Sequence, residues 1–193
     1  STTVAHRIVG WQAPLERLSE SFQAVKSTLN VVQFGGAIGS LAALGPNGPQ
    51  VRCLLAQRLG LIDPKGAWHT ERSRLLEYTF WLSSLANALG KLGHDILLMS
   101  QDERSEIVLI GVGGSSAMEH KQNPVKAEIL LALARFVTTL QSGMQHASVH
   151  EQERSGSAWA VEWMVLPQLC IATGSALITA QTLLNSVQSL GDR

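Results

Sequence analysis

Two adjacent serines, a lysine and the start of a helix lie within one short segment near the middle of the chain. Ser115 and Ser116 follow a pair of glycines, which leave the backbone free to change conformation. Asn123 and Pro124 predict a helix start, with the asparagine as N-cap and the proline in the first turn. The free amides and the dipole of a helix start attract negative charge, and Lys121 adds a full positive charge. These residues predict a pocket for a carboxylate or a phosphate, with hydroxyls that could transfer a proton.

Two other interpretations of this segment stay open. It could be an ordinary capped helix that follows a flexible surface loop. Gly111, Gly113 and Gly114 could also suggest a nucleotide-binding loop. However, the pattern Gly-x-x-x-x-Gly-Lys-Ser/Thr is absent and no β-α-β unit is expected around the loop, which makes a nucleotide site a weak hypothesis.

Three long segments are expected to form the scaffold that positions the loop. Residues 8–29, 68–101 and 157–190 carry apolar residues three or four apart, the last with an expected kink at Pro167. A spacing that averages about 3.5 residues keeps one apolar stripe on one face of each helix. At about 1.5 Å per residue, the second helix would be roughly 50 Å long, and only helices of similar length can cover its stripe. The sequence therefore predicts an all-α fold, a bundle of long antiparallel helices.

Shorter elements are expected between these helices. Residues 51–59 predict a short helix, and a longer one should begin at Pro124 and end near residue 145. Residues 107–110 form a β-like run. The glycine-rich stretch 33–39 predicts a tight turn that joins helices, and alternatively lines a substrate pocket.

The composition is that of a folded domain and argues against several classes of partner. Hydrophobic residues make up 45% of the 193 residues, and 15 basic residues balance 15 acidic ones. Neither a nucleic-acid footprint nor a polybasic membrane anchor is expected. Cys53 and Cys170 lack a Cys-x-x-Cys companion, which predicts reduced thiols in a cytoplasmic protein. No stretch approaches the roughly 20 uninterrupted apolar residues of a membrane span, and no secretory signal is expected.

The loop also resembles the signature of a known family. The pattern Gly-Ser-x-x-Met-x-x-Lys-x-Asn, filled by residues 114–123, is similar to that of the fumarase/aspartase superfamily. Further features sharpen the resemblance toward the cycloisomerase branch, which converts 3-carboxy-cis,cis-muconate to 4-carboxymuconolactone in protocatechuate catabolism. These features are Ser116, His120, Pro124 and the stretches 33–36, 68–70 and 159–163. The resemblance covers essentially the whole chain.

The resemblance implies a role for each residue of the loop. Ser115 matches the family's catalytic base, which moves a proton on the carbon beside a carboxylate. Lys121 and Asn123 match residues that bind the substrate carboxylate. Ser116 and Met118 match residues that shape the closed loop around the substrate.

Five residues outside the core of the pattern are also candidates. Glu128 matches a glutamate that orients a histidine from another subunit, and His120 could donate a hydrogen bond to substrate. Arg154 is a candidate second anion contact, or alternatively a solvated loop charge. Arg72, with its neighbour His69, is expected to fix the start of the second long helix, or alternatively to contact substrate.

The chemistry implied by the resemblance explains these residue types. Proton transfer beside a carboxylate builds an enediolate, which fixed amides, a helix start and a lysine stabilise. A serine hydroxyl could act as a base only if the closed loop excludes water and the positive field favours its alkoxide. The implied substrate is a small tricarboxylate. The attacking group is an internal carboxylate, so neither a metal nor an organic cofactor is implied.

Two departures from the family pattern matter. Glu119 stands where most relatives have proline, and its charge could weaken substrate binding. The family builds each active site from three regions donated by three subunits of a homotetramer, and two of these regions are expected upstream of Ser1. Residues 1–193 are therefore expected to be the central helical-bundle domain of a truncated enzyme, inactive by itself. Long apolar stripes independently favour association with further copies.

Three functions compete at this point. The first is lactonisation, the second is a C–N lyase such as adenylosuccinate lyase, and the third is a non-catalytic helical assembly module. A phosphate-bearing substrate would call for a further basic cluster, for which Arg154 alone is thin support. A vestigial loop would tolerate loss of Ser115 or Lys121, and both are present. The cycloisomerase is therefore favoured.

Overall fold

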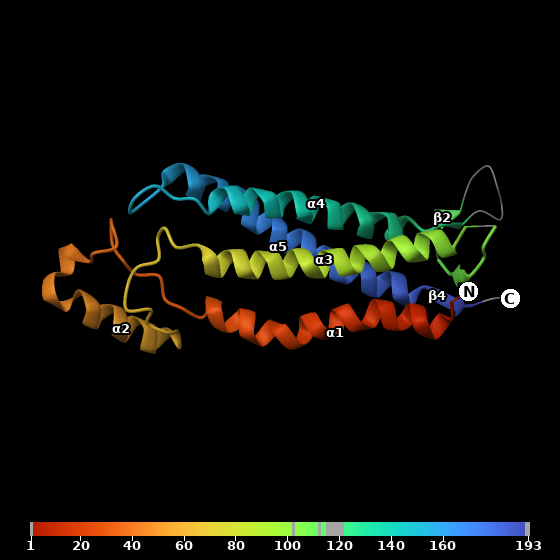
Figure 1. The fold of residues 1–193 in the computed structure, drawn as a ribbon, viewed down its shortest axis with the longest axis horizontal. Helices are drawn as coiled ribbons and strands as arrows, with labels where there is room; N and C mark the ends of the chain where they lie inside the picture. The colour runs from red at the N-terminus through yellow and green to blue at the C-terminus, as the bar shows by residue number, and fades with distance from the viewer. Residues whose placement is uncertain (1, 102, 112, 115–121, 192–193) are drawn as a thin grey trace. The chain divides into compact units, whose positions relative to one another are not determined.

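Long helices dominate the fold, as predicted. A computed structural model describes residues 2–101, 103–111, 113–114 and 122–191, and Figure 1 draws each long helix as one continuous ribbon. The strands form only two short antiparallel pairs among these residues, so the all-α class is confirmed. In chain order the elements are α1 (Val4–Leu29), the 3-10 helix η1 (Ala42–Asn47), α2 (Gly48–Leu59), α3 (Ser73–Met99), β1 (Ile107–Leu109), β2 (Gly113–Gly114), β3 (Gln122–Asn123), α4 (Val125–Ala147), α5 (Gly156–Asn185) and β4 (Val187–Leu190).

The chain divides into two compact units, and each long helix contributes to both of them. The first unit comprises Ser1–Glu20, Leu82–Leu140 and Pro167–Arg193. The second comprises Ser21–Trp81 and Gln141–Leu166. Each unit therefore gathers segments that are distant in the sequence.

Two glycines bring α3 and α4 close together in the first unit. A Cβ atom added at Gly90 would lie 2.4 Å from the Cβ of Ala134. One added at Gly93 would lie 2.7 Å from the Cβ of Leu130 and 2.8 Å from the carbonyl oxygen of Ala127. No side chain fits at either position without a shift of the neighbouring helix, so the two backbones pack at close range.

A polar network joins α1 to α3 in the same unit. The indole nitrogen of Trp11 donates to the Asp95 carboxylate at 2.6 Å, and Lys91 pairs with the same carboxylate. Burial raises the pKa of Asp95, but the hydrogen bonds from Lys91 and Trp11 outweigh it and the net pKa is lowered. Asp95 therefore stays ionised and holds the two helices in register.

The helix predictions are confirmed in position but differ at the ends. α3 begins at Ser73, later than the predicted residue 68, because Trp68 bonds through its backbone amide to Gln33 (3.1 Å) and through its indole to Val32 (3.1 Å). Residues 187–190 do not continue the last helix, because they pair with β1 as β4. Pro167 lies inside a continuous α5, and the expected kink there stays a prediction.

One helix of the described residues, α5, is long and apolar enough to cross a membrane by length and composition. Its most apolar window has a mean hydropathy of 1.4, and 28% of that window is buried. The sequence-based expectation that no stretch resembles a membrane span therefore does not hold for α5 by length and composition. The core helix of a soluble protein passes the same test, and α5 carries Glu162, which is buried in an ion pair with Arg72.

Candidate functional site

A short pair of strands holds together the ends of the predicted anion-binding loop. β2 pairs with β3 in an antiparallel ladder that places Gly113 opposite Asn123. β3 leads through Pro124 directly into α4, so the strand pair is followed at once by a helix start. Five predicted site residues lie outside the part of the chain that the structure describes, namely Ser115, Ser116, Met118, His120 and Lys121.

The helix after this loop starts one residue later than predicted. Asn123 belongs to β3, and the carbonyl of Pro124 accepts hydrogen bonds from the amides of Ala127 (2.8 Å) and Glu128 (3.2 Å). The prediction of Asn123 as N-cap and Pro124 as the first helical residue is therefore wrong by one position, because pairing with Gly113 keeps Asn123 extended. Glu128 is exposed in the first turn of α4, where a carboxylate complements the helix dipole.

Arg154 lies in the second unit and is held in a defined direction. Its guanidinium stacks 4.5 Å from the centroid of the Trp159 ring, and its Nη1 donates to the carbonyl of Ala37 at 3.1 Å. The residue is exposed, and this is the one hydrogen bond that its guanidinium makes to the described residues. Arg154 is therefore an exposed charge with two contacts to the described residues, and it keeps further N–H donors available for a ligand.

Two histidines border the same ring. His69 meets Trp159 edge-on with 5.7 Å between ring centroids, and His150 lies at 6.4 Å. Within the described part of the chain, Nδ1 of His69 and both ring nitrogens of His150 are buried without a hydrogen-bond partner. Burial, followed by the charges of Arg154 and Arg72, lowers the pKa of His69 below its usual 6.5. His69 is therefore a neutral imidazole at physiological pH.

A buried ion pair fastens the start of α3 to α5 next to these histidines. Arg72 donates from Nε to Glu162 Oε2 (2.9 Å) and from Nη2 to Glu162 Oε1 (2.6 Å). Its Nη1 donates to the carbonyl of Trp68 at 3.1 Å. Both side chains of the pair are more than 90% buried, so Arg72 has the predicted role in fixing a helix start.

The glycine-rich loop before η1 is a tight turn, as predicted, and it also borders a hollow. Gly36, Gly39 and Leu41 adopt left-handed backbone angles, with φ of 68°, 89° and 55°. Residues between 34 and 44 line a mostly apolar hollow of about 510 Å³. Ala37, whose carbonyl accepts from Arg154, belongs to this lining. The turn thus places a cation at the edge of an apolar hollow.

Sequence reasoning did not predict that Arg154 contacts the glycine-rich turn, because Ala37 and Arg154 are 117 positions apart. One signal was present. The three stretches that sharpened the family resemblance, residues 33–36, 68–70 and 159–163, all belong to the second unit. They supply His69 and the Trp159 ring, against which Arg154 stacks.

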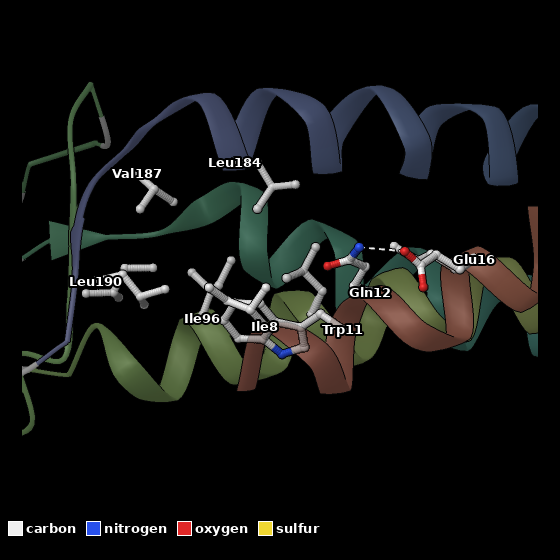
Figure 2. A pocket seen from close by; sticks show the side chains of 11 residues that line it. Ile8, Trp11, Gln12, Glu16, Ile96, Leu184, Val187 and Leu190 are labelled. Atoms are coloured by element: carbon white, nitrogen blue, oxygen red, sulfur yellow. Dashed lines mark hydrogen bonds between the residues drawn. The ribbon is translucent and has the colours of Figure 1, made fainter. Parts of the chain in front are cut away.

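The first unit holds a second concave region, an apolar pocket of about 390 Å³. Figure 2 shows Ile8, Trp11 and Ile96 on one side of this pocket and Leu184 on another. The indole nitrogen of Trp11 is directed to Asp95. The other polar groups of the lining are Gln12 and Glu16, where the Gln12 amide donates to the Glu16 carboxylate at 2.5 Å. The described lining therefore offers contact area for apolar groups and no pair of groups suited to proton transfer.

Comparison with known proteins places this fold and loop in a family. A sequence model of a family described as lyase matches residues 1–138. The chain belongs to this lyase family. The match confirms the resemblance to the fumarase/aspartase superfamily that the loop signature carried.

Individual relatives show how much of the family fold is present. A 3-carboxy-cis,cis-muconate cycloisomerase of Pseudomonas aeruginosa is 40% identical over 189 residues, which cover 96% of this chain and 41% of that protein. The crystal structure of a 3-carboxy-cis,cis-muconate lactonizing enzyme from Pseudomonas putida superposes with a TM-score of 0.87 at 39% identity, covering 96% of this chain and 41% of that one. A class II fumarase from Schistosoma mansoni, at 18% identity and a TM-score of 0.78, covers 95% of this chain and 43% of that one and shows the fold alone. The chain thus spans about 41% of the length of the first two relatives.

Proposed function

We propose that the protein carrying this chain is a cycloisomerase that converts 3-carboxy-cis,cis-muconate to 4-carboxymuconolactone. The observation that carries the proposal is the 40% identity, over 96% of the chain, to a protein with that activity in its name. The presence of Ser115, Met118, Lys121 and Asn123 in the expected pattern supports it. Residues 1–193 would then supply the central helical region of a cytoplasmic enzyme.

In the proposed mechanism, an internal carboxylate oxygen attacks one carbon of a C=C double bond of the substrate and forms the new C–O bond of the lactone. The electron pair of that double bond moves to the adjacent carbon, which lies beside another carboxylate and takes a proton from the Ser115 hydroxyl. The Ser115 alkoxide then regains a proton from solvent. The negative charge that builds on that second carboxylate is stabilised by Lys121 and by the amides at the start of α4. Glu128, exposed in that first turn, can orient a histidine supplied by another subunit.

Arg154 is the proposed contact for a further carboxylate of the tricarboxylate substrate. Its position supports this role, because the guanidinium stands at the edge of the apolar hollow that Ala37 helps to line. A planar fork suits a carboxylate, and the hollow suits a hydrocarbon body.

Assembly into a homotetramer is the second part of the proposal. In the first unit, α4 exposes Val125, Ile129 and Phe136, and α5 exposes Ile171 and Ile178. Such stripes at helical spacing favour burial against further helices rather than exposure to water. A Phe136→Glu substitution is expected to shift the protein toward smaller species in analytical ultracentrifugation, and an unchanged sedimentation coefficient would count against this interface.

The activity is tested by ultraviolet absorbance of 3-carboxymuconate with the whole protein. Ser115→Ala is expected to lower kcat by about 10²–10⁴-fold, the range for loss of a positioned acid–base group. Ser27→Ala, an exposed serine on α1, is the matched control and should keep wild-type turnover. Wild-type turnover of adenylosuccinate in place of carboxymuconate would favour the lyase alternative, and absence of any turnover would favour the assembly module. The 193-residue chain by itself is expected to show no turnover.

A further inference from the structure

Two segments of the second unit that are 90 positions apart are fastened at two neighbouring points. The first fastening is the indole nitrogen of Trp159, which donates to the carbonyl of His69 at 3.2 Å. The second is the bidentate pair between Arg72 and Glu162. His69 and Arg72 are three residues apart before α3, and Trp159 and Glu162 are three residues apart on α5. Each segment is therefore held at two points, which on α5 lie about one helical turn apart.

The ion pair is expensive to build and is better suited to fixing direction than to adding stability. Both partners are more than 90% buried, and removing two charges from water costs about as much as their attraction returns. The planar fork of Arg72 accepts only one orientation of the Glu162 carboxylate. A third bond, from Arg72 to the carbonyl of Trp68, fixes the guanidinium to its own segment as well.

These bonds orient the ring of Trp159. Glu162 fixes the rotation of the first turns of α5, and the indole bond to His69 fixes the ring within that turn. The Arg154 guanidinium stacks on this ring at 4.5 Å, and its one hydrogen bond among the described residues is to the loop carbonyl of Ala37. The direction of its remaining N–H donors is therefore set largely by the ring.

We infer that Arg72 and Glu162 are positioning residues that act through Trp159 to aim the Arg154 guanidinium at a carboxylate of the substrate. The inference depends on the proposed function for the identity of the substrate. The pair touches no substrate itself, and its contribution is to binding rather than to the proton transfer at the loop.

The test is steady-state kinetics of the whole protein with Glu162→Gln, which keeps the shape of the side chain and removes its charge. The expected result is a rise in KM of about tenfold with kcat changed by less than about threefold, the pattern for loss of binding energy shared by ground and transition states. Arg154→Met should raise KM at least as much. Since both changes act on one contact, the double variant should be no worse than Arg154→Met alone.

Arg74→Gln is the matched control. Arg74 lies two residues from Arg72 and faces the same Trp68 ring, at 5.9 Å from its centroid, but its ion pair with Glu71 is exposed. KM of this variant should stay within about twofold of wild type. An unchanged KM for Glu162→Gln, or additive effects of Glu162→Gln and Arg154→Met, would overturn the inference.

Two further measurements keep the inference testable if the first variant or the proposed substrate fails. Arg72→Lys keeps the buried charge but loses the fork, so it should reproduce the KM effect in a folded protein even where Glu162→Gln folds poorly. A crystal structure of either variant should show the Trp159 ring displaced and its bond to His69 broken. If the wild-type protein does not turn over carboxymuconate, the proposed function fails, while an undisplaced ring would overturn the positioning role separately.

Discussion

The two parts of α3 are joined to their neighbours in opposite ways. In the first unit, Gly90 and Gly93 bring its backbone against α4, and the contact depends on close apolar packing. In the second unit, Arg72 at its start is joined to Glu162 of α5 by charge and hydrogen bonds. Packing gains free energy in proportion to the area removed from water, whereas a buried ion pair gains little net free energy and tolerates one geometry. One helix thus stabilises the fold along one stretch and orients a candidate site at its other end.

The most direct test of this difference removes one partner of the buried ion pair, so that the other charge stays buried without a partner. Glu162→Ala is expected to lower the free energy of unfolding by about 3–5 kcal/mol, because Arg72 would remain buried without its carboxylate. Denaturant unfolding of the 193-residue chain at one fixed protein concentration measures the loss.

The control for that experiment replaces both partners. The double variant Arg72→Met with Glu162→Leu is expected to lie within about 1 kcal/mol of wild type or above it, since no charge is left buried. If the single and double variants lose the same free energy, the pair stabilises the fold directly and the contrast with the glycine contact disappears.

The next largest effect is expected at the glycine contact. Gly93→Ala should cost about 1–3 kcal/mol, because the new Cβ would lie 2.8 Å from the carbonyl oxygen of Ala127, which belongs to the backbone of α4 and cannot rotate away. Gly10→Ala is the matched control, since nothing lies within 4 Å of a Cβ there and alanine favours a helix by up to about 1 kcal/mol. Equal changes in the midpoint of thermal unfolding for the two variants would contradict close packing of α3 on α4.

The sequence predicted the helices well because their apolar periodicity is local information. It failed at three ends, and each failure has a tertiary cause. Trp68 is held by residues near 32 and delays α3, residues 187–190 find a strand partner in β1, and Asn123 is paired in β3. A pattern read along one segment contains no information about such partners.

The candidate site likewise has one part that the sequence could predict and one part that it could not. The loop signature is contiguous, so sequence alone identified Ser115 and Lys121 as candidates, although both lie outside the described residues. The cluster around Trp159 depends on contacts across 90 and 117 positions, and the sequence indicated Arg154 only through the family resemblance. The pairing of Arg72 with Glu162 was not predicted, because a charged residue on a helix is far more often solvated than buried.

A smaller effect than either of these is expected from pH, and it concerns only His69, which lies just before α3. The pKa of His69 in the folded chain lies below its usual 6.5, owing to burial first and then to Arg154 and Arg72. As the pH falls through 6.5, the unfolded chain therefore takes up a proton before the folded one, and stability decreases toward acid. Above that range both states are neutral, and His69 makes no pH-dependent contribution.

The measurement compares wild type with His69→Gln by denaturant unfolding from about pH 8 to about pH 5. The difference in unfolding free energy should be constant near the alkaline end and shift in favour of the variant toward acid, since glutamine takes up no proton. A difference that stays constant over the whole range would show that the folded chain accommodates the imidazolium at no cost.

The smallest expected effect separates burial of an ion pair from mere proximity to an aromatic ring at the start of α3. Arg72 and Arg74 both face the ring of Trp68, at 5.0 Å and 5.9 Å, and both pair with a glutamate. The pair of Arg74 with Glu71 is exposed, so water and salt screen it and Arg74→Gln should cost less than about 0.5 kcal/mol. Raising the salt concentration should remove even that difference, while leaving the loss in Glu162→Ala largely intact, because a buried charge is screened far less. A loss in Arg74→Gln comparable to that of Glu162→Ala would mean that the aromatic contact, and not the buried carboxylate, holds the start of α3.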